Sequence, residues 1–198
     1  MCPVRSMGRG IRQRAVSVVV AIATGSLIGC GGAASPDATA QQATGTTVGN
    51  IRMGQLAPEL DTEPLQGAGP KTLAEGRGRV VLIDFWATFC KPCKALLPEY
   101  QTMVDDYDGK LAVIAVSVDE PDDVDAERIK AFIADLGVSF SVVWDRRHAT
   151  VSRYDPPAMP TTYLGDPQGV VRYGFTGLEG GDTARVRQAV DELLQSSP

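Results

Sequence analysis

The 198-residue sequence predicts an α/β domain in three layers, with a central mixed β-sheet and helices on both of its faces. Two observations predict this class. Apolar runs of strand length alternate with segments whose apolar residues recur at helical spacing. Towards the carboxyl end, a turn rich in glycine separates two short runs as in a β-hairpin, so antiparallel strands join the parallel ones.

The amino-terminal half of this domain alternates strand and helix. Residues 80–86 are apolar apart from Asp84, which is typical of a central strand covered on both faces. Apolar side chains recur at helical spacing over residues 96–107, and residues 111–118 form a second buried strand. A further helix is predicted over residues 125–136, where the apolar side chains fall on one face.

The carboxyl-terminal half ends in a hairpin and a helix. Residues 139–144 are predicted as a third strand. Residues 161–164 and 170–175 flank the turn and form the hairpin. The last element is an amphipathic helix over residues 182–194. The predicted order is therefore β-α-β-α-β followed by β-β-α.

Two cysteines follow the first buried strand, in the sequence W-A-T-F-C-K-P-C over residues 86–93. Cys90 and Cys93 are expected at the start of the next helix. The unpaired amides and the positive end of the helix dipole favour a thiolate over a thiol at that place. The pair therefore predicts a redox site.

Other uses of the cysteine pair fit the sequence less well. Structural zinc needs four ligands, and beyond this pair the chain offers only Cys2, Cys30 and a single histidine, His148. A disulfide that spans two residues removes little chain entropy, so a purely structural bond is disfavoured. We assign no metal ligands and no cofactor.

The amino terminus has the pattern of an export signal. Four arginines come first, followed by the apolar stretch Ala15–Ile28, which is too short for an ordinary membrane span. L-I-G-C at residues 27–30 resembles a bacterial lipobox, which implies cleavage and acylation at Cys30. The alternative is a soluble export signal in which Cys30 is incidental. Met7 is an alternative start of the chain.

Three segments follow from these patterns. Residues 1–29 are predicted to be a lipoprotein signal peptide, residues 30–50 the lipidated cysteine with a flexible tether, and residues 51–198 one folded domain. The predicted tether is rich in small and polar residues and contains no aromatic residue. The folded segment is long enough for a single core.

The chain is acidic, with a formal net charge of −5. An acidic surface binds nucleic acid poorly, so we exclude nucleic acid as a partner. The acidic runs Asp105–Asp106 and Asp119–Asp123 are predicted to be solvated helix ends and loops. They lack the ligand spacing of a dedicated calcium-binding loop.

Residues 80–98, together with M-P-T-T at residues 159–162, resemble a thioredoxin fold. More narrowly, the chain is similar to the TlpA/ResA-like family of envelope thiol–disulfide oxidoreductases, from about Gly54 onward. A-P-E-L at residues 57–60 and the additional helix over residues 125–136 fit that family.

The resemblance implies roles for individual residues. Cys90 would be the exposed attacking thiol and Cys93 the more buried resolving thiol, so that the pair cycles between a dithiol and a redox disulfide. Pro160 would be a cis-proline that faces the cysteines, and the backbone of Met159 would bind a partner segment. Trp86 would pack beneath the site and contribute to the substrate-binding surface.

Asp84 is the one acid inside the first buried strand, and burial should raise its pKa. It matches the buried acid of thioredoxin, whereas many relatives in the envelope family carry an uncharged amide there. We therefore expect Asp84 to be catalytic, as the group that accepts the proton of Cys93.

The resemblance implies a membrane-tethered thiol–disulfide oxidoreductase of the bacterial cell envelope, lipid-anchored, with its domain facing the periplasm or the exterior. Its expected partners are disulfide-bearing envelope proteins, with apocytochrome c among the candidates, and an upstream membrane electron donor. Reduction of the partner is the favoured direction. Two other classes stay open, namely a copper chaperone or metal-binding lipoprotein and a thiol peroxidase.

Overall fold

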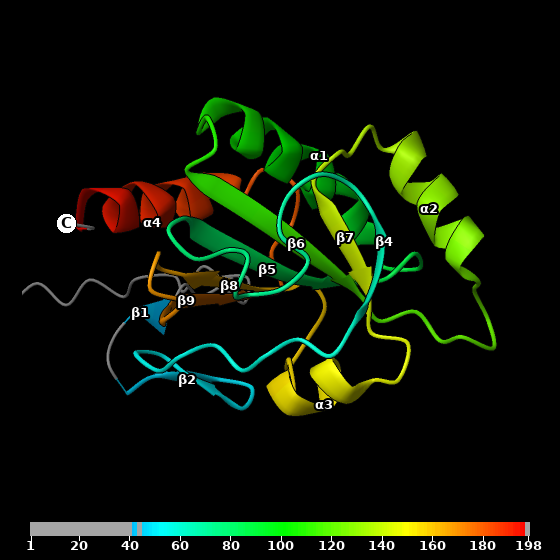
Figure 1. Ribbon diagram of the computed structural model, residues 1–198, viewed down its shortest axis with the longest axis horizontal. Helices are drawn as coiled ribbons and strands as arrows, with labels where there is room; N and C mark the ends of the chain where they lie inside the picture. Colours follow the sequence, from blue (N-terminus) through cyan, green and yellow to red (C-terminus); the bar gives the residue numbers. More distant parts are fainter. Residues whose placement is uncertain (1–40, 43–44, 197–198) are drawn as a thin grey trace, which may run out of the picture. The chain divides into compact units, whose positions relative to one another are not determined.

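A computed structural model describes residues 41–42 and 45–196 of the chain (Figure 1). Its strands are β1 (Gln41–Gln42), β2 (Thr47–Val48), β3 (Ile51–Arg52), β4 (Glu63–Gln66), β5 (Val80–Trp86), β6 (Leu111–Ser117), β7 (Ser141–Trp144), β8 (Thr161–Gly165) and β9 (Val171–Thr176). Its helices are α1 (Lys91–Asp106), α2 (Ala126–Asp135), α3 (Ala149–Tyr154) and α4 (Thr183–Ser196). Across these described ranges, every helix falls short of the length and apolar character that a membrane span requires.

Seven strands form one mixed sheet in the order β1-β9-β8-β5-β6-β7-β4. Strands β5, β6 and β7 run parallel, whereas β8 pairs antiparallel with β5 and β9 pairs antiparallel with β8. Strands β2 and β3 form a separate hairpin. The prediction of a thioredoxin-like fold with a central mixed sheet is confirmed, and β5 lies in the middle of that sheet.

Alternation along β5 divides its side chains between the two faces. All seven residues of β5 are buried, as are all seven of β6. Leu82 and Trp86 join the core on the α1 side of the sheet, whereas Ile83 and Phe85 join the core on the other side. Because side chains alternate along a strand, Asp84 points to the same face as Leu82 and Trp86.

The two faces of the sheet are covered differently (Figure 1). Helices α1, α2 and α4 contribute apolar side chains to one core cluster. The opposite cluster is covered by α3, the β2–β3 hairpin and the segment that leads to β5. Tyr154 at the end of α3 is fully buried and donates a hydrogen bond to the Pro58 carbonyl at 2.6 Å. Helices therefore lie on both faces as predicted, although α3 is too short for a periodic pattern to predict it.

The helix ends follow local sequence rules. Asp125 caps α2 by accepting a hydrogen bond from the Arg128 N–H at 2.8 Å. Gly137 follows the end of α2 with a φ of 67°, a left-handed conformation that glycine adopts without steric cost. In α4 the predicted apolar face is buried and consists of Val186, Ala189, Val190 and Leu193.

The ordered domain begins earlier than the predicted boundary at residue 51. Val48, inside the predicted tether, is only 5% exposed and packs in the core, and β1 pairs with β9. Gly49 turns the chain with a φ of 55°, and a Cβ there would lie 2.2 Å from the Asp155 carbonyl oxygen. The polar composition around Val48 gave no indication that its side chain packs in the core. The predicted boundaries around Cys30 lie outside the described residues.

Candidate active site

The two cysteines lie where the chain passes from β5 into α1. Cys90 is the N-cap residue of α1, and its Sγ accepts a hydrogen bond from the Cys93 N–H at 3.3 Å. Pro92 lies in the first turn, where an N–H would have no intrahelical partner. The amides of this turn and the helix dipole therefore favour negative charge on the Cys90 sulfur.

Cys90 and Cys93 form a disulfide, with their Cα atoms 5.3 Å apart. Cys90 is 7% exposed and Cys93 is 0% exposed. The predicted order of accessibility is present, but the description of Cys90 as an exposed thiol is too strong, because only an edge of the residue reaches solvent in the oxidised form. Of the two cysteines, only Cys90 therefore offers surface to a partner.

The Met159–Pro160 peptide bond is cis, as the resemblance implied. It comes directly before β8, whose Thr161 pairs with Phe85 of β5. The turn therefore lies beside the end of β5 that leads to Cys90. Pro160 is buried and Met159 is half-buried, so Met159 is the member of this pair that a partner can reach.

Asp84 is completely buried in the middle of β5. Its Oδ1 accepts a hydrogen bond from the Thr162 hydroxyl at 2.7 Å, whereas its Oδ2 is buried and has no hydrogen-bond partner among the described residues. Burial raises the pKa of Asp84 to about 7, and the Thr162 hydrogen bond opposes part of that rise. The acid therefore changes its protonation near neutral pH, which suits a proton acceptor.

Asp119 is a second buried acid, and its predicted place in a solvated loop is wrong. It is 0% exposed, whereas the next residue, Glu120, is exposed as predicted. Its carboxylate accepts hydrogen bonds from the Thr88 N–H at 3.0 Å, the Thr88 hydroxyl at 2.6 Å and the Ser117 hydroxyl at 2.9 Å. The sequence position of Asp119 could have indicated this role, because Asp119 follows β6 and the carboxyl ends of parallel strands lie at one edge of the sheet. That edge also carries Cys90.

Trp86 does not form part of a substrate-binding surface, contrary to the prediction. It is 0% exposed and stacks on Phe132 of α2, with ring centroids 5.7 Å apart. Phe89, directly before Cys90, is instead 73% exposed. Phe89 also lines a groove beside α2. The groove is lined by Thr88, Phe89, Asp123, Val124, Arg128 and Phe132.

His148 lies next to the acidic loop that follows β6. Its Nδ1 is 3.5 Å from Oε1 of Glu120. Within residues 41–42 and 45–196, no three His, Cys, Asp or Glu side chains gather in a group that could hold a metal ion.

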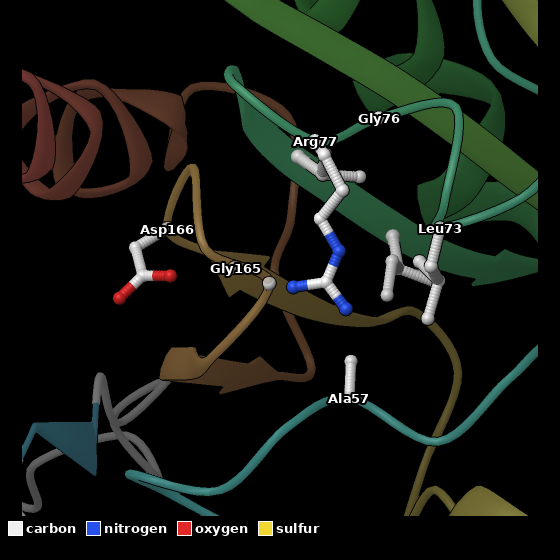
Figure 2. Close-up of a pocket in the computed structure, with 9 residues that line it drawn as sticks. Ala57, Leu73, Gly76, Arg77, Gly165 and Asp166 are labelled. Atoms are coloured by element: carbon white, nitrogen blue, oxygen red, sulfur yellow. The ribbon is translucent and has the colours of Figure 1, made fainter.

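A second recess lies near the start of β5, where Val81 pairs with Gly165 (Figure 2). Its volume is about 10 Å³, which is room for about one water molecule. Arg77 extends across it and packs on Gly169, where a Cβ would lie 2.1 Å from Nη1 of Arg77. This recess is too small for a substrate, so the cysteine end of the sheet is the candidate active site.

These features define a class of protein. A mixed sheet, a cysteine pair at the start of the helix after its central strand, and a neighbouring cis-proline characterise thioredoxin-like proteins. The chain belongs to the AhpC/TSA family, which it matches over residues 53–174. It is an enzyme of the thiol–disulfide oxidoreductase class.

Known relatives agree with this assignment. The chain is similar to the thioredoxin-like protein YneN of Bacillus subtilis, with 32% identity over 122 residues that cover 62% of this chain and 70% of the relative. It is similar to the thiol-disulfide oxidoreductase ResA of Geobacillus thermodenitrificans, with 30% identity over 128 residues that cover 64% of this chain and 71% of the relative. A crystal structure of a proposed thiol:disulfide interchange protein DsbE from Chlorobium tepidum superimposes with a TM-score of 0.64 at 29% identity, covering 73% of this chain and 99% of that one. The expected family resemblance is confirmed.

Proposed function

We propose that this protein is a membrane-tethered enzyme that reduces disulfides of proteins in the bacterial cell envelope through Cys90 and Cys93. The observation that carries the proposal is the asymmetry of the pair, because Cys90 has surface at the start of α1 whereas Cys93 is fully buried. Such a pair suits an exchange in which one sulfur meets the partner and the other releases it. The similarity to thiol-disulfide oxidoreductases named ResA supports the same chemistry.

The exchange has two steps. The Cys90 thiolate attacks one sulfur of the partner's disulfide, that S–S bond breaks, and the partner's other sulfur leaves as a thiolate that takes a proton. Cys93 then loses its proton and attacks the Cys90 sulfur, so the mixed disulfide breaks and the partner's second thiolate leaves. The partner gains two electrons and the enzyme becomes the Cys90–Cys93 disulfide. An upstream dithiol electron donor in the membrane would return the pair to its reduced form.

Asp84 is proposed to accept the proton of Cys93 in the second step. Both residues belong to the α1 side of the sheet, which is shielded from water. A thiolate is unfavourable in such surroundings unless a nearby base takes the proton. With its pKa raised to about 7, Asp84 is partly ionised at neutral pH. Its Oδ2, which has no hydrogen-bond partner among the residues that the structure describes, is available for that proton.

Phe89 and Met159 are proposed to contact the partner polypeptide. Phe89 is next to Cys90 in the chain and leaves a large aromatic ring in solvent beside a groove. Exposed aromatic side chains of this kind are typical of contact sites between proteins. Met159 lies before the cis-proline and is half-buried. Its backbone can add strand-like hydrogen bonds to an extended segment.

The envelope location is proposed from the sequence of the amino terminus. The basic start, the apolar stretch and the lipobox-like L-I-G-C support export, cleavage and acylation at Cys30. Two or three acyl chains would anchor the protein stably. The chain between Cys30 and the folded domain would let the active site reach partners near the membrane surface.

The decisive experiment traps partners in the native host. A Cys93→Ser variant should accumulate reductant-sensitive adducts on Cys90 with envelope proteins, because the resolving step is removed. A Cys90→Ser variant is the matched control and should trap none. Apocytochrome c among the adducts would indicate a role in haem attachment, and a broad set would indicate general disulfide reduction. Absence of adducts, together with peroxide-dependent turnover or tight copper binding by the wild type, would contradict the proposal.

A further inference from the structure

Tyr100 and Thr162 form a buried chain of hydrogen bonds that ends on Asp84. The Tyr100 hydroxyl lies 2.9 Å from the Thr162 hydroxyl, and the Thr162 hydroxyl donates to Oδ1 of Asp84 at 2.7 Å. All three residues are 0% exposed. They belong to α1, β8 and β5. These two hydrogen bonds therefore connect the helix that carries Cys93 to the strand that carries Asp84.

The direction of these hydrogen bonds is fixed when Asp84 is ionised. A threonine hydroxyl has a single hydrogen, and Thr162 gives it to Oδ1 of Asp84. Tyr100 must therefore be the donor to Thr162. Burial raises the pKa of Tyr100 well above its ordinary range, and the negative charge of Asp84 adds to the rise. Tyr100 consequently stays protonated over the whole range in which Asp84 titrates.

The two oxygens of Asp84 are not equivalent. Oδ1 accepts from Thr162, whereas Oδ2 is buried and unpaired within the described ranges. A proton placed on Oδ1 and directed at Thr162 would require the Thr162 hydroxyl to turn its single hydrogen away from Asp84. A proton placed on Oδ2 leaves the existing hydrogen bonds unchanged. Oδ2 is therefore the oxygen that can take a proton without disturbing the hydrogen bond from Thr162.

Around Asp84 the other groups offer no compensating positive charge in the described part of the chain. Strand β6 places Ala115 beside it, and β5 and α4 contribute apolar side chains to this face. The buried titratable residues of α1 are Cys93 and Tyr100, and the negative charge of Glu99 acts on Tyr100. The Thr162 hydrogen bond is therefore the main interaction that favours the ionised carboxylate over the neutral acid.

We propose that Thr162 and Tyr100 are positioning residues for the release step, which hold Asp84 ionised with Oδ2 free to receive the proton of Cys93. The inference rests on the proposed role of Asp84 as the proton acceptor. Thr162 acts directly on the carboxylate, and Tyr100 acts by fixing the direction of the Thr162 hydroxyl. Neither residue touches the partner.

The test uses Thr162→Val, which nearly keeps the shape of the side chain and removes the hydroxyl, and Thr162→Ser, which restores it. The first readout is the infrared titration of the Asp84 carboxyl in the oxidised protein, identified by its loss in Asp84→Asn. The second is stopped-flow mixing of the reduced protein with an aromatic disulfide whose released thiolate is coloured. The first coloured thiolate reports attack by Cys90, and the second reports release by Cys93.

Loss of a hydrogen bond to an ionised group changes an ionisation equilibrium by about tenfold. Thr162→Val should therefore move the carboxyl midpoint to higher pH and slow the second phase about tenfold below neutral pH, and the rates should converge at alkaline pH. Thr162→Ser should restore both readouts. Tyr100→Phe should give a smaller effect of the same sign. Tyr154→Phe, a buried tyrosine on the other face of the sheet, is the matched control and should leave the midpoint unchanged.

The two readouts separate this inference from the proposed function. An unchanged carboxyl midpoint in folded Thr162→Val protein, with release still following the Asp84 titration, would overturn the inference alone. The carboxyl midpoint of Asp84 could instead move while the rate of the second phase does not depend on that titration. This result would overturn the role of Asp84 as proton acceptor, and with it the positioning role of Thr162 and Tyr100. If Thr162→Val does not fold, Tyr100→Phe decides by the same criteria.

Discussion

Asp119 holds Thr88 through both the main-chain N–H and the hydroxyl, at 3.0 and 2.6 Å. Two hydrogen bonds to one residue fix both the position and the orientation of the peptide that leads to Cys90. Strands β5 and β6 are parallel neighbours, so an acid at the end of β6 reaches the loop at the end of β5. The position of the segment that leads to Cys90 is therefore fixed by an acid at the end of the neighbouring strand β6.

Replacing this acid tests the relationship. Asp119→Asn keeps the shape but puts an NH₂ group, a donor, where the carboxylate accepted from donors. We expect the free energy of unfolding to fall by about 1–3 kcal/mol. The exposed Asp122→Asn is the control, with an expected change within about 0.5 kcal/mol. Urea denaturation measures both, and equal stability of the two variants would contradict the anchoring role of Asp119.

The asymmetry of the cysteine pair predicts their order of alkylation. In the reduced protein, Cys90 should react with iodoacetamide about tenfold faster than Cys93, because it lies at the helix start and has the greater exposure. Peptide mapping by mass spectrometry after short labelling times measures the two rates. Faster labelling of Cys93 would reverse the assignment of attacking and resolving thiols.

The sequence was sufficient for the parts of the fold that local patterns determine. Strands β5 and β6 are buried on both faces, and their apolar runs, interrupted in β5 by Asp84, predicted this. The cysteine pair could also be predicted from the sequence. Cys90 and Cys93 are close in the chain, and their position between a strand and a helix determines their surroundings. The apolar face of α4 followed from its spacing alone.

The remaining features depend on contacts between distant parts of the chain. Thr162 is 78 positions from Asp84, so only the register of β8 on β5 brings the two together. Trp86 and Phe89 are both aromatic and three positions apart, and the packing of α2 decides which one is buried. Asp119 has the same acidic character as its exposed neighbours, and only its place after β6 distinguishes it. No local pattern distinguishes the buried Trp86 from the exposed Phe89.

Phe89 should contribute to recognition of protein substrates. Phe89→Ala should lower kcat/KM for reduction of a protein disulfide roughly tenfold, since a well-placed aromatic contact is worth about 1–2 kcal/mol. The effect on a small substrate such as oxidised glutathione should be much smaller, because glutathione covers less of the groove. Leu56→Ala is a matched control, since Leu56 is 62% exposed and outside this groove. A similar loss in both variants would contradict a specific role for Phe89.

The predicted membrane location depends on acylation of Cys30. The mature wild-type protein should begin at an acylated Cys30 and fractionate with membranes. Cys30→Ala should block processing or release the protein, and thiol–disulfide exchange by the folded domain should continue. Amino-terminal mass spectrometry and membrane fractionation test this. A freely soluble wild type that begins at another residue would remove the lipid anchor from the proposed function and leave the redox chemistry untouched.

The buried Asp84 should make the stability of the protein depend on pH in a definite direction. Its pKa is raised from 3.8 to about 7 by burial, so between these values the folded state holds a proton that the unfolded chain has lost. The stability associated with that proton is fully present below the lower pKa and is lost as the pH rises through the upper one. The total is on the order of 4 kcal/mol, taking about 1.4 kcal/mol for each pH unit between the two values.

Asp84→Asn isolates this contribution, because it keeps the shape and removes the titration. In the oxidised form, where neither Cys90 nor Cys93 titrates, the variant should gain stability relative to the wild type as the pH rises from about 4 to about 7, and the difference should stay constant above that range. Other acids titrate equally in both proteins and cancel in the difference. Urea denaturation at a series of pH values measures it. Parallel profiles for the two proteins would mean that Asp84 is ionised in the folded state across this range, and it could then not act as a base poised near neutral pH.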